Sequence, residues 1–420
     1  MPGHPPFSPR DLYVGCLADV HRWGGATTAA TGMCGAARAR GWQTLMIGAT
    51  SRHDDAAIAA PDPARFNLRI SAAPLLWRIQ SWRTAGRLAR QLARLAPPRK
   101  AFVGVSPHWV IAARRAWPSV CIAYLFPCLL ANCLPFTWPR RRTPTFWRRV
   151  DFAGIVRTEH LAFDLADLTL VPTPQSRAEI LAFHPHVDER LAVCNYGCRP
   201  RAITAEMRAA QRRRLGVDED AFVIFAAGVC DLNKAFGHAV RELASVDPRA
   251  HLVVLGAGPE RPELTRVAAE LGVAGRLHLP GPQPDPAPWY AAADCVASTS
   301  WYDTFPNVVL EGMHHSRPVV VPRHDPPHVF SGTAEIVAEI GAGRVYDRRQ
   351  PGALACAVNR LIADRAAAAA LGARGRAAAL ERFRWERVAD HVAALCGEPP
   401  MRDEQPRERP QPQCEGVHVG

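Results

Sequence analysis

Residues 298–322 read STSWYDTFPNVVLEGMHHSRPVVVP and decide the expected fold of this chain. The stretch places two carboxylates, Asp303 and Glu311, eight residues apart around a proline, and it ends in an apolar run. Proline is favoured in the first turn of a helix, where the backbone N–H groups have no intrahelical partner. We therefore expect a helix to open at Pro306 and Asn307, with free N–H groups that attract an anion. The apolar run that follows predicts a buried strand.

Asp303 lies just before this predicted anion site, and Glu311 lies about one turn inside the helix. An ionised carboxylate can only accept hydrogen bonds. Two such acceptors beside a phosphate-binding helix start suit the hydroxyl groups of a sugar and of a ribose. The stretch therefore predicts a site for a nucleotide-diphospho-sugar.

Residues 303–313, DTFPNVVLEGM, resemble the E-x7-E signature of the family 4 glycosyltransferases, also called glycosyl transferases group 1. The resemblance implies an α/β protein of the GT-B fold, in which two Rossmann-like domains face each other across a cleft. It also implies transfer of a sugar to an acceptor hydroxyl with retention of the anomeric configuration and without a metal or cofactor. Glu311 would accept hydrogen bonds from the ribose. Asp303, one methylene shorter than the usual glutamate, would contact the sugar with altered reach or donor choice.

The same resemblance assigns further donor-binding residues in the second half of the chain. Gly228 opens a loop that ends at Lys234, and Lys234 would neutralise the donor diphosphate as a point charge. A lysine that only faces solvent in this loop is the alternative. Gly281 would line the nucleotide base. The start of the predicted helix would complete the donor site with Phe305, Pro306, Asn307 and Val308.

One residue departs from the family pattern. The family commonly has an arginine directly after the glycine, where this chain has Val229. One phosphate contact is therefore missing or is supplied by another residue. Together with Asp303, this departure keeps open a protein that binds a nucleotide sugar or a partner without transfer. A nucleotide-sugar epimerase or a phosphorylase on the same fold is a further alternative.

A pair of glycines, Gly24 and Gly25, separates a predicted strand at 11–17 from a predicted helix at 26–40. Without a Cβ, this turn would let the backbone of the first domain approach the donor diphosphate closely. An ordinary tight turn would use the same two residues.

His108 follows the strand predicted at 101–105, at the end that should face the cleft. It either contacts the donor sugar or the acceptor, or it only caps a loop. With Asp303 and Lys234, it is a candidate catalytic residue.

The length of 420 residues exceeds that of one ordinary core, and alternating strands and helices predict two α/β domains. Predicted strands lie at 11–17, 44–48, 101–105, 120–125, 168–171, 222–226, 252–255, 277–279, 295–297 and 319–321. The expected organisation is a disordered start (1–10), an acceptor-side Rossmann-like domain (11–199), a linker (200–218), a nucleotide-sugar-binding Rossmann-like domain (219–376), a crossing helix (377–396) and a disordered tail (397–420).

Positive charge is concentrated in the first half of the chain. Residues 1–200 hold 25 Lys and Arg against 12 Asp and Glu, whereas residues 201–420 hold 26 against 27. The excess indicates an anionic partner, such as lipid headgroups or a phosphorylated acceptor, and no nucleic-acid-binding motif accompanies it. A basic amphipathic helix at 75–100 and the aromatic–arginine segment at 136–149 suggest peripheral membrane contact. The alternative is a core-facing helix and a loop with solvated charges. The acceptor is expected to be a saccharide, a lipid-linked molecule or a small molecule.

The twelve cysteines include no C-x-x-C pair, which favours reduced thiols. The N-terminal residues do not resemble a signal peptide, so we expect a cytoplasmic protein, with the inner face of the membrane as an alternative. No metal site is expected, because prolines between His324 and His328 prevent the helix that would align them. Gly256 and Gly258 lack the third glycine of a dinucleotide fingerprint, so no cofactor is predicted.

Overall fold

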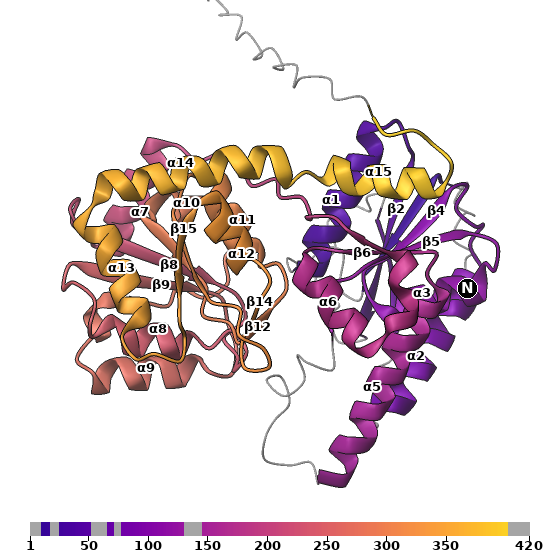
Figure 1. The fold of residues 1–420 in the computed structure, drawn as a ribbon, viewed down its shortest axis with the longest axis horizontal. Coiled ribbons are helices and arrows are strands. Elements are labelled where there is room, and N and C mark those ends of the chain that lie inside the picture. The colour runs from indigo at the N-terminus through magenta and orange to yellow at the C-terminus, as the bar shows by residue number, and fades with distance from the viewer. Residues whose placement is uncertain (1–9, 17–24, 52–64, 71–76, 130–144, 402–420) are drawn as a thin grey trace, which may run out of the picture.

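The computed structural model describes residues 10–16, 25–51, 65–70, 77–129 and 145–401. They form two α/β domains that lie side by side, with the last helices of the chain running along both (Figure 1). Each domain is built on a wholly parallel sheet. The α/β fold class predicted from the sequence is confirmed.

The first domain has seven strands in the order β3-β2-β1-β4-β5-β6-β7. The strands are β1 (Leu12–Gly15), β2 (Thr44–Ser51), β3 (Arg65–Ile70), β4 (Ala101–Gly104), β5 (Cys121–Leu125), β6 (Leu168–Val171) and β7 (Leu191–Val193). The helices are α1 (Gly25–Ala39), α2 (Trp77–Leu92), α3 (Pro107–Ala116), α5 (Thr145–Leu165), α6 (Pro174–Phe183) and the 3-10 turn η1 (Pro185–Arg190). Strands such as β1 are buried along their whole length, because the connecting helices cover both faces of a parallel sheet.

The second domain repeats this plan with six strands in the order β10-β9-β8-β11-β13-β15, and a small separate sheet pairs β12 with β14. The strands are β8 (Phe222–Ala227), β9 (Ala250–Leu255), β10 (Leu277–His278), β11 (Cys295–Ala297), β12 (Tyr302–Asp303), β13 (Val319–Pro322), β14 (Phe330–Ser331) and β15 (Gly343–Tyr346). The helices of the second domain are α7 (Ala205–Leu215), α8 (Phe236–Leu243), α9 (Arg261–Glu270), η2 (Ala274–Arg276), α10 (Ala287–Ala292), α11 (Asn307–His314), α12 (Ala334–Ile340), α13 (Ala353–Ala363) and α14 (Arg365–Arg382). The last helix, α15 (Trp385–Leu395), packs on the first domain.

The chain crosses back to the first domain through α15, while α14 stays on the second domain (Figure 1). Trp385, at the start of α15, is 3% exposed and stacks on Tyr196 with a ring-centroid distance of 6.1 Å. A Cβ at Gly197 would lie 2.3 Å from Trp385, so a glycine is required at this close approach. The segment predicted as a crossing helix, 377–396, therefore corresponds to the end of α14 and all of α15.

The segment expected as a linker, 200–218, contains the regular helix α7. Arg208 donates to the carbonyls of Ala291, Ala292 and Ala293, and Arg208 and Arg212 both bind Asp294. The segment has little apolar periodicity because its arginines, rather than apolar side chains, attach it to the end of α10. Most of the expected linker is therefore part of the second domain.

The first residues of the tail expected to be disordered have a defined position on the first domain. Glu398 accepts hydrogen bonds from Lys100 Nζ at 2.5 Å and from Trp42 Nε1 at 3.1 Å. The expectation of disorder was wrong for residues 397–401, because a charged side chain can fix a segment that has little apolar surface to bury. Residues 402–420 and the expected disordered start at 1–9 lie outside the described residues.

The predicted basic amphipathic helix is present as α2. Leu88 and Leu92 are fully buried in the core of the first domain, while Arg90 and Arg94 are exposed. The apolar side of α2 therefore packs against the domain, as the core-facing alternative predicted. Most of the aromatic–arginine segment at 136–149 lies outside the described residues. Among the described helices, none combines the length and the apolar character needed to cross a membrane.

Candidate active site

The C-terminal ends of β8 and β11 meet at the point where the strand order of the second sheet reverses. In doubly wound sheets, ligands bind in the crevice outside the strand ends at such a point. Gly228 directly follows β8, and the loop that leads to Asp303 follows β11. The topology therefore brings together the two segments in which the sequence predicted donor contacts.

Lys234 and Asp303 form an ion pair at this strand edge. Lys234 Nζ donates to Asp303 Oδ2 at 2.6 Å, and the Ser300 hydroxyl donates to the same oxygen at 3.2 Å. The Lys234 and Asp303 side chains are 26% and 16% exposed, so both remain accessible to solvent. This contact excludes the alternative that Lys234 only faces solvent.

The loop of Lys234 and the loop of Asp303 are joined by further hydrogen bonds. The Asn233 side chain donates to the Tyr302 carbonyl and accepts from the Tyr302 N–H, both at 3.0 Å. The Thr299 hydroxyl donates to the Lys234 carbonyl at 2.7 Å. The two loops therefore form one hydrogen-bonded unit that fixes the ion pair.

The predicted helix begins at Asn307 as α11, with Pro306 as the residue before its first turn. Pro306 has φ −65° and ψ 119°, and no side chain caps the N–H groups that follow. Val308 is partly buried against the core. The Phe305 side chain is 8% exposed and packs against Tyr196 and Phe383. Any contact of Phe305 with a donor would therefore be made by its backbone, and the donor contact predicted for Phe305 stays a prediction.

Glu311 lies on α11 and keeps part of its surface exposed. Burial raises the pKa of its carboxyl, and a hydrogen bond from the Tyr290 hydroxyl lowers that pKa in part. Glu311 also lies close enough to Cys198 to help raise the pKa of that thiol, although burial is the larger cause. A carboxylate with one fixed donor has acceptor capacity left for the hydroxyls of a ligand.

The first-domain candidates lie at the C-terminal edge of their own sheet. Gly25 is the first residue of α1, and a Cβ built there would meet nothing within 4 Å. Its predicted neighbour Gly24 lies outside the described residues. His108 lies in the first turn of α3, directly after the β4 strand, and is 4% exposed. Burial lowers the pKa of His108 to about 4, so its imidazole is neutral at pH 7.

The loops of Gly256 and Gly281 both make contacts within the second domain, and the base contact predicted for Gly281 stays a prediction. A Cβ at Gly256 would lie 1.9 Å from the Gly228 carbonyl oxygen, so this glycine allows two strand-end loops to touch. The Arg261 guanidinium donates to the Leu279 carbonyl at 2.5 Å, next to Gly281. His324 Nδ1 accepts from the Ser331 N–H at 3.2 Å. Among the described residues, no group of three or more His, Cys, Asp or Glu is placed to hold a metal ion.

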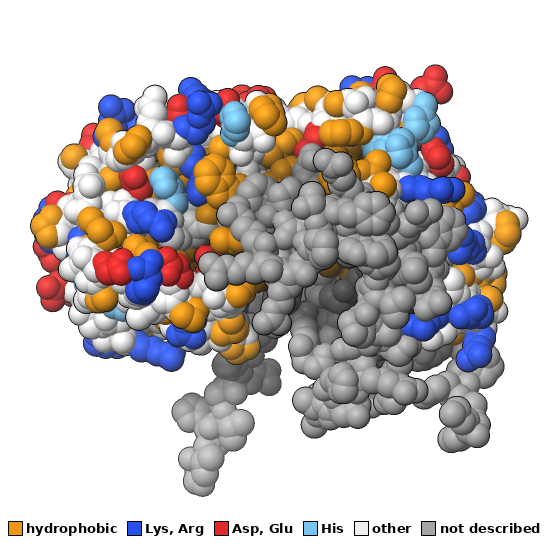
Figure 2. Space-filling view, turned by 90° about the horizontal axis from the view of Figure 1, so that it is seen from below, with side chains coloured by type: hydrophobic (Ala, Val, Ile, Leu, Met, Phe, Trp, Pro, Cys, Tyr) orange, Lys and Arg blue, Asp and Glu red, His pale blue; other side chains and the backbone are white. Residues whose placement is uncertain are grey.

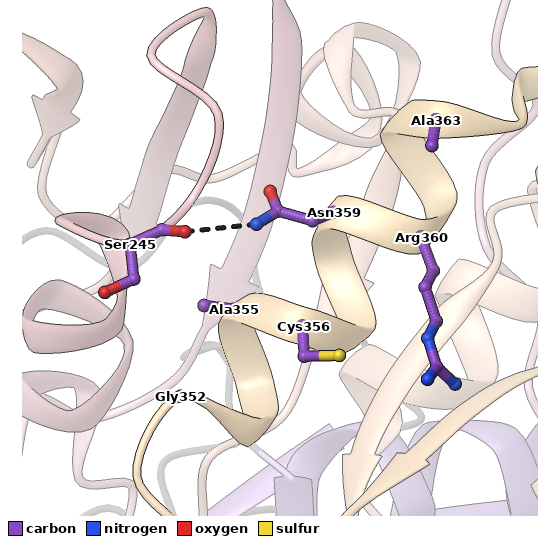
Figure 3. A pocket seen from close by; sticks show the side chains of 7 residues that line it. All are labelled: Ser245, Gly352, Ala355, Cys356, Asn359, Arg360 and Ala363. Carbon is purple, nitrogen blue, oxygen red and sulfur yellow. Dashed lines mark hydrogen bonds between the residues drawn. The ribbon is translucent and has the colours of Figure 1, made fainter.

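Figure 3 shows a pocket of about 470 Å³ on another part of the second domain. Its residues come from α13 and from the loop at Ser245, and the Asn359 side chain donates to the Ser245 carbonyl at 3.0 Å. None of the candidate site residues lines this pocket. It is therefore separate from the Lys234–Asp303 site.

Sequence reasoning missed the residues that hold the site together. Asn233, Ser300 and Tyr290 each bond to a candidate residue or its neighbour. Asn233 and Ser300 stand inside stretches that the sequence had singled out, but polar residues are common in loops. Only the folded structure, which brings the loops of Asn233 and Asp303 together, distinguishes these two residues from other polar loop residues.

Comparison with known proteins finds similarity to glycosyltransferases. Residues 221–364 match the family model described as glycosyl transferases group 1. The lipopolysaccharide core biosynthesis glycosyltransferase LpsE of Rhizobium meliloti is 30% identical over 199 residues, which are 47% of this chain and 56% of LpsE. The chain spans about half of the length of the curated relatives that it matches.

Solved structures share the whole two-domain fold. WaaG, a glycosyltransferase involved in lipopolysaccharide biosynthesis, superposes with a TM-score of 0.71 at 16% identity, covering 92% of this chain and 100% of WaaG. Anabaena HepE, solved in complex with UDP and glucose, gives a TM-score of 0.68 at 16% identity, covering 92% of this chain and 99% of HepE. The resemblance seen at residues 303–313 is thus confirmed: the chain has the GT-B fold, and its residues 221–364 match the model of the glycosyl transferases group 1 family.

Proposed function

We propose that this protein transfers a sugar from a nucleotide-diphospho-sugar to an acceptor hydroxyl. The observation that carries the proposal is the solvent-accessible Lys234–Asp303 pair beside the start of α11, at the strand-order reversal of the domain that matches the family model. A cation, a helix N-terminus and two carboxylates are the groups that a diphosphate, a sugar and a ribose require.

In the proposed reaction, Lys234 and the free N–H groups of α11 stabilise the negative charge of the departing diphosphate. Asp303 orients the sugar, and Glu311 accepts from the ribose hydroxyls. Gly25 and His108 face the donor from the first domain, which holds the acceptor. The neutral imidazole of His108 would orient a hydroxyl through one hydrogen bond. The protein's contribution is therefore positioning and charge stabilisation.

The proposal also includes retention of the anomeric configuration, independence of a metal, and a saccharide, lipid-linked or small-molecule acceptor. The HepE structure contains UDP and glucose, so UDP-sugars are the first donors to test. Proton NMR of the product would show retention or inversion at the anomeric carbon. Turnover that stops in EDTA and returns with Mn²⁺ would contradict metal independence.

The donor site is tested by thermal unfolding of the wild type and Glu311→Gln with UDP, GDP, ADP, CMP and dTDP, without metal. A ligand at about 100 times its Kd stabilises a protein by roughly 2.7 kcal/mol, which is easily measured. We expect one nucleotide to stabilise the wild type and to stabilise the variant less. If no nucleotide stabilises the wild type, the proposed donor site is wrong.

A second candidate function is binding of a nucleotide sugar without transfer. Val229 is 56% exposed at the position where the family commonly has an arginine, so this contact to the phosphate is absent. Donor binding combined with no release of nucleoside diphosphate, with or without candidate acceptors, would favour this alternative. Measurable donor hydrolysis without an acceptor would contradict it.

A further inference from the structure

The loop that carries Asp303 also reaches the first domain through Tyr302. The Tyr302 side chain is 5% exposed, and its hydroxyl donates to Glu179 Oε2 at 2.7 Å. The same hydroxyl oxygen accepts from the Leu129 N–H at 3.2 Å. Glu179 lies on α6 and Leu129 follows β5, so both partners belong to the first domain.

Asp303 is flanked by a second contact of the same kind. The Thr304 hydroxyl, on the other side of Asp303, donates to the Pro127 carbonyl of the first domain. Tyr302 and Asp303 together form β12, which pairs with β14 in the second domain. Asp303 therefore lies on a short strand whose neighbours on both sides are attached to the opposite domain.

The backbone of Tyr302 is equally fixed on the donor side. Its N–H and carbonyl both bond to the Asn233 side chain, next to Lys234. Its ring packs against Phe330 with a centroid distance of 4.9 Å. One residue thus links the Lys234 loop, the Asp303 strand and the first domain.

The first-domain side of this contact is also well ordered. Thr173 accepts from the Ser176 N–H and Pro174 occupies the first turn, which together set the start of α6. Glu179 projects from this capped helix. Its position relative to the first sheet therefore also rests on contacts within the first domain.

We infer that Tyr302 is a positioning residue for the proposed transfer: its hydroxyl, held between Glu179 and Leu129, fixes the Asp303–Lys234 pair against the first domain. The inference rests on the proposed function, because that pair is the proposed donor contact. A hydroxyl buried in an interface costs free energy unless it is hydrogen-bonded, so its two partners favour one spacing of the domains. Tyr302 acts through Asp303, because its own hydroxyl is bonded to the first domain.

The first test removes only the hydroxyl, with Tyr302→Phe, and follows UDP release from UDP-glucose together with UDP binding. We expect kcat to fall about tenfold, the loss of one hydrogen bond to a charged group, while KM for UDP-glucose and Kd for UDP change less than about threefold. Gln175→Ala is the matched control, because Gln175 on the same helix donates to Glu335 of the second domain, a contact between the domains in which Tyr302, Asp303 and Lys234 take no part. An equal fall in kcat for both variants would overturn the inference.

The second test is hydrogen–deuterium exchange, which needs no substrate. Tyr302→Phe should speed exchange in peptides covering 233–235 and 301–305, and Gln175→Ala should not. Glu179→Ala removes the same hydrogen bond by changing its acceptor, which is partly exposed. This variant should give the same result, and it replaces Tyr302→Phe if that variant folds poorly. Unchanged exchange at 301–305 in both Tyr302→Phe and Glu179→Ala would overturn the inference.

The two tests also separate this inference from the proposed function. If UDP, GDP and ADP all fail to bind the wild type, the proposed function is wrong, and exchange at 301–305 still decides whether Tyr302 holds the loop. If a nucleotide binds and exchange is unchanged, the proposed function stands and the role of Tyr302 is rejected.

Discussion

Lys234 Nζ and Asp303 Oδ2 lie 2.6 Å apart, although 69 residues separate the two positions in the chain. The pair is partly exposed and lies at the reversal point of the second sheet. Because Asp303 already neutralises the lysine, an incoming diphosphate must share or replace this contact. The two members of the pair should therefore affect nucleotide binding in opposite directions.

Lys234→Ala should weaken binding of UDP by about tenfold, because a charge-assisted contact to phosphate is lost. Asp303→Asn should leave UDP binding unchanged or strengthen it by a few-fold, because the lysine no longer has a competing carboxylate. Both variants should lower turnover of UDP-glucose. Isothermal titration of UDP against each variant measures whether the Kd for UDP rises or falls. An equal rise in Kd for both variants would show that the pair acts only as a structural unit.

Gly25→Ala should leave stability within about 0.5 kcal/mol of wild type, because the new Cβ meets nothing within 4 Å. If the diphosphate approaches this backbone, the same methyl group should weaken donor binding. Gly35→Ala is the control: it lies within the same helix and its Cβ would make only an ordinary contact with Arg199. Thermal unfolding with and without UDP-glucose compares the two, and identical ligand shifts for both variants would exclude a donor contact at Gly25.

Tyr290→Phe should change the pH dependence of nucleotide binding. The Tyr290 hydroxyl lowers the pKa of Glu311, which burial raises, so removal of the hydroxyl should raise that pKa further. Glu311 accepts fully only when ionised, so the acid limit of UDP affinity should move to higher pH in the variant. Titration calorimetry from pH 5 to pH 8 measures this shift. Superimposable profiles would mean that Glu311 does not bind the ribose.

Stability should fall as the pH drops from about 6.5 towards 4. Burial is the largest cause that lowers the pKa to about 4 for five imidazoles, namely His108, His184, His238, His314 and His315. These groups are neutral in the folded protein and gain protons on unfolding below pH 6.5, so acid favours the unfolded state.

Each buried imidazole should contribute on the order of 1 to 3 kcal/mol over that interval, and the loss should level off below the folded pKa. Urea unfolding at pH 7.5, 6 and 5 measures the slope. His184→Asn should reduce the slope relative to wild type. A slope that His184→Asn leaves unaltered would show that this imidazole is not the group that titrates.

The distribution of Lys and Arg on the described surface can be compared with the excess of positive charge counted in residues 1–200. In the view of Figure 2, Lys and Arg side chains line the outer edge of the first domain, whereas the second domain shows both signs. The positive excess of residues 1–200 is a count from the sequence, and Figure 2 shows some of the Lys and Arg side chains on one face of that domain. The anionic partner inferred from this charge stays a prediction. The apolar side of α2 packs into the domain core, so α2 gives no separate support for contact with a membrane.

Central strands could be predicted more readily than edge strands: the edge strand β10 was predicted at 277–279, but the edge strands β15 and β3 were not. A strand such as β8 is buried on both faces, so it appears in the sequence as the unbroken apolar run at 222–226. The edge strand β15 carries Arg344 and is only partly buried, and it pairs with β13 alone. The edge strand β3 was missed as well. An edge strand is half solvated, so its residues need no pattern that distinguishes it from a loop.

The sequence by itself determined the local chemistry of the proposed donor site. Asp303, Pro306, Asn307 and Glu311 lie within nine residues, and the start of a helix follows from proline geometry and backbone hydrogen bonding alone. For the same reason the α/β class could be predicted, because the order of apolar runs and helices is a property of the chain.

Only the tertiary structure decided which distant groups complete that site. Lys234 with Asp303, Tyr290 with Glu311, and Tyr302 with Glu179 come from different strands, helices or domains. A hydrogen bond requires its two atoms to lie within about 3 Å, and strand order and domain contact set that distance. Spacing along the sequence carries no information about it, so these pairs exist only once the sheets and the two domains have assembled.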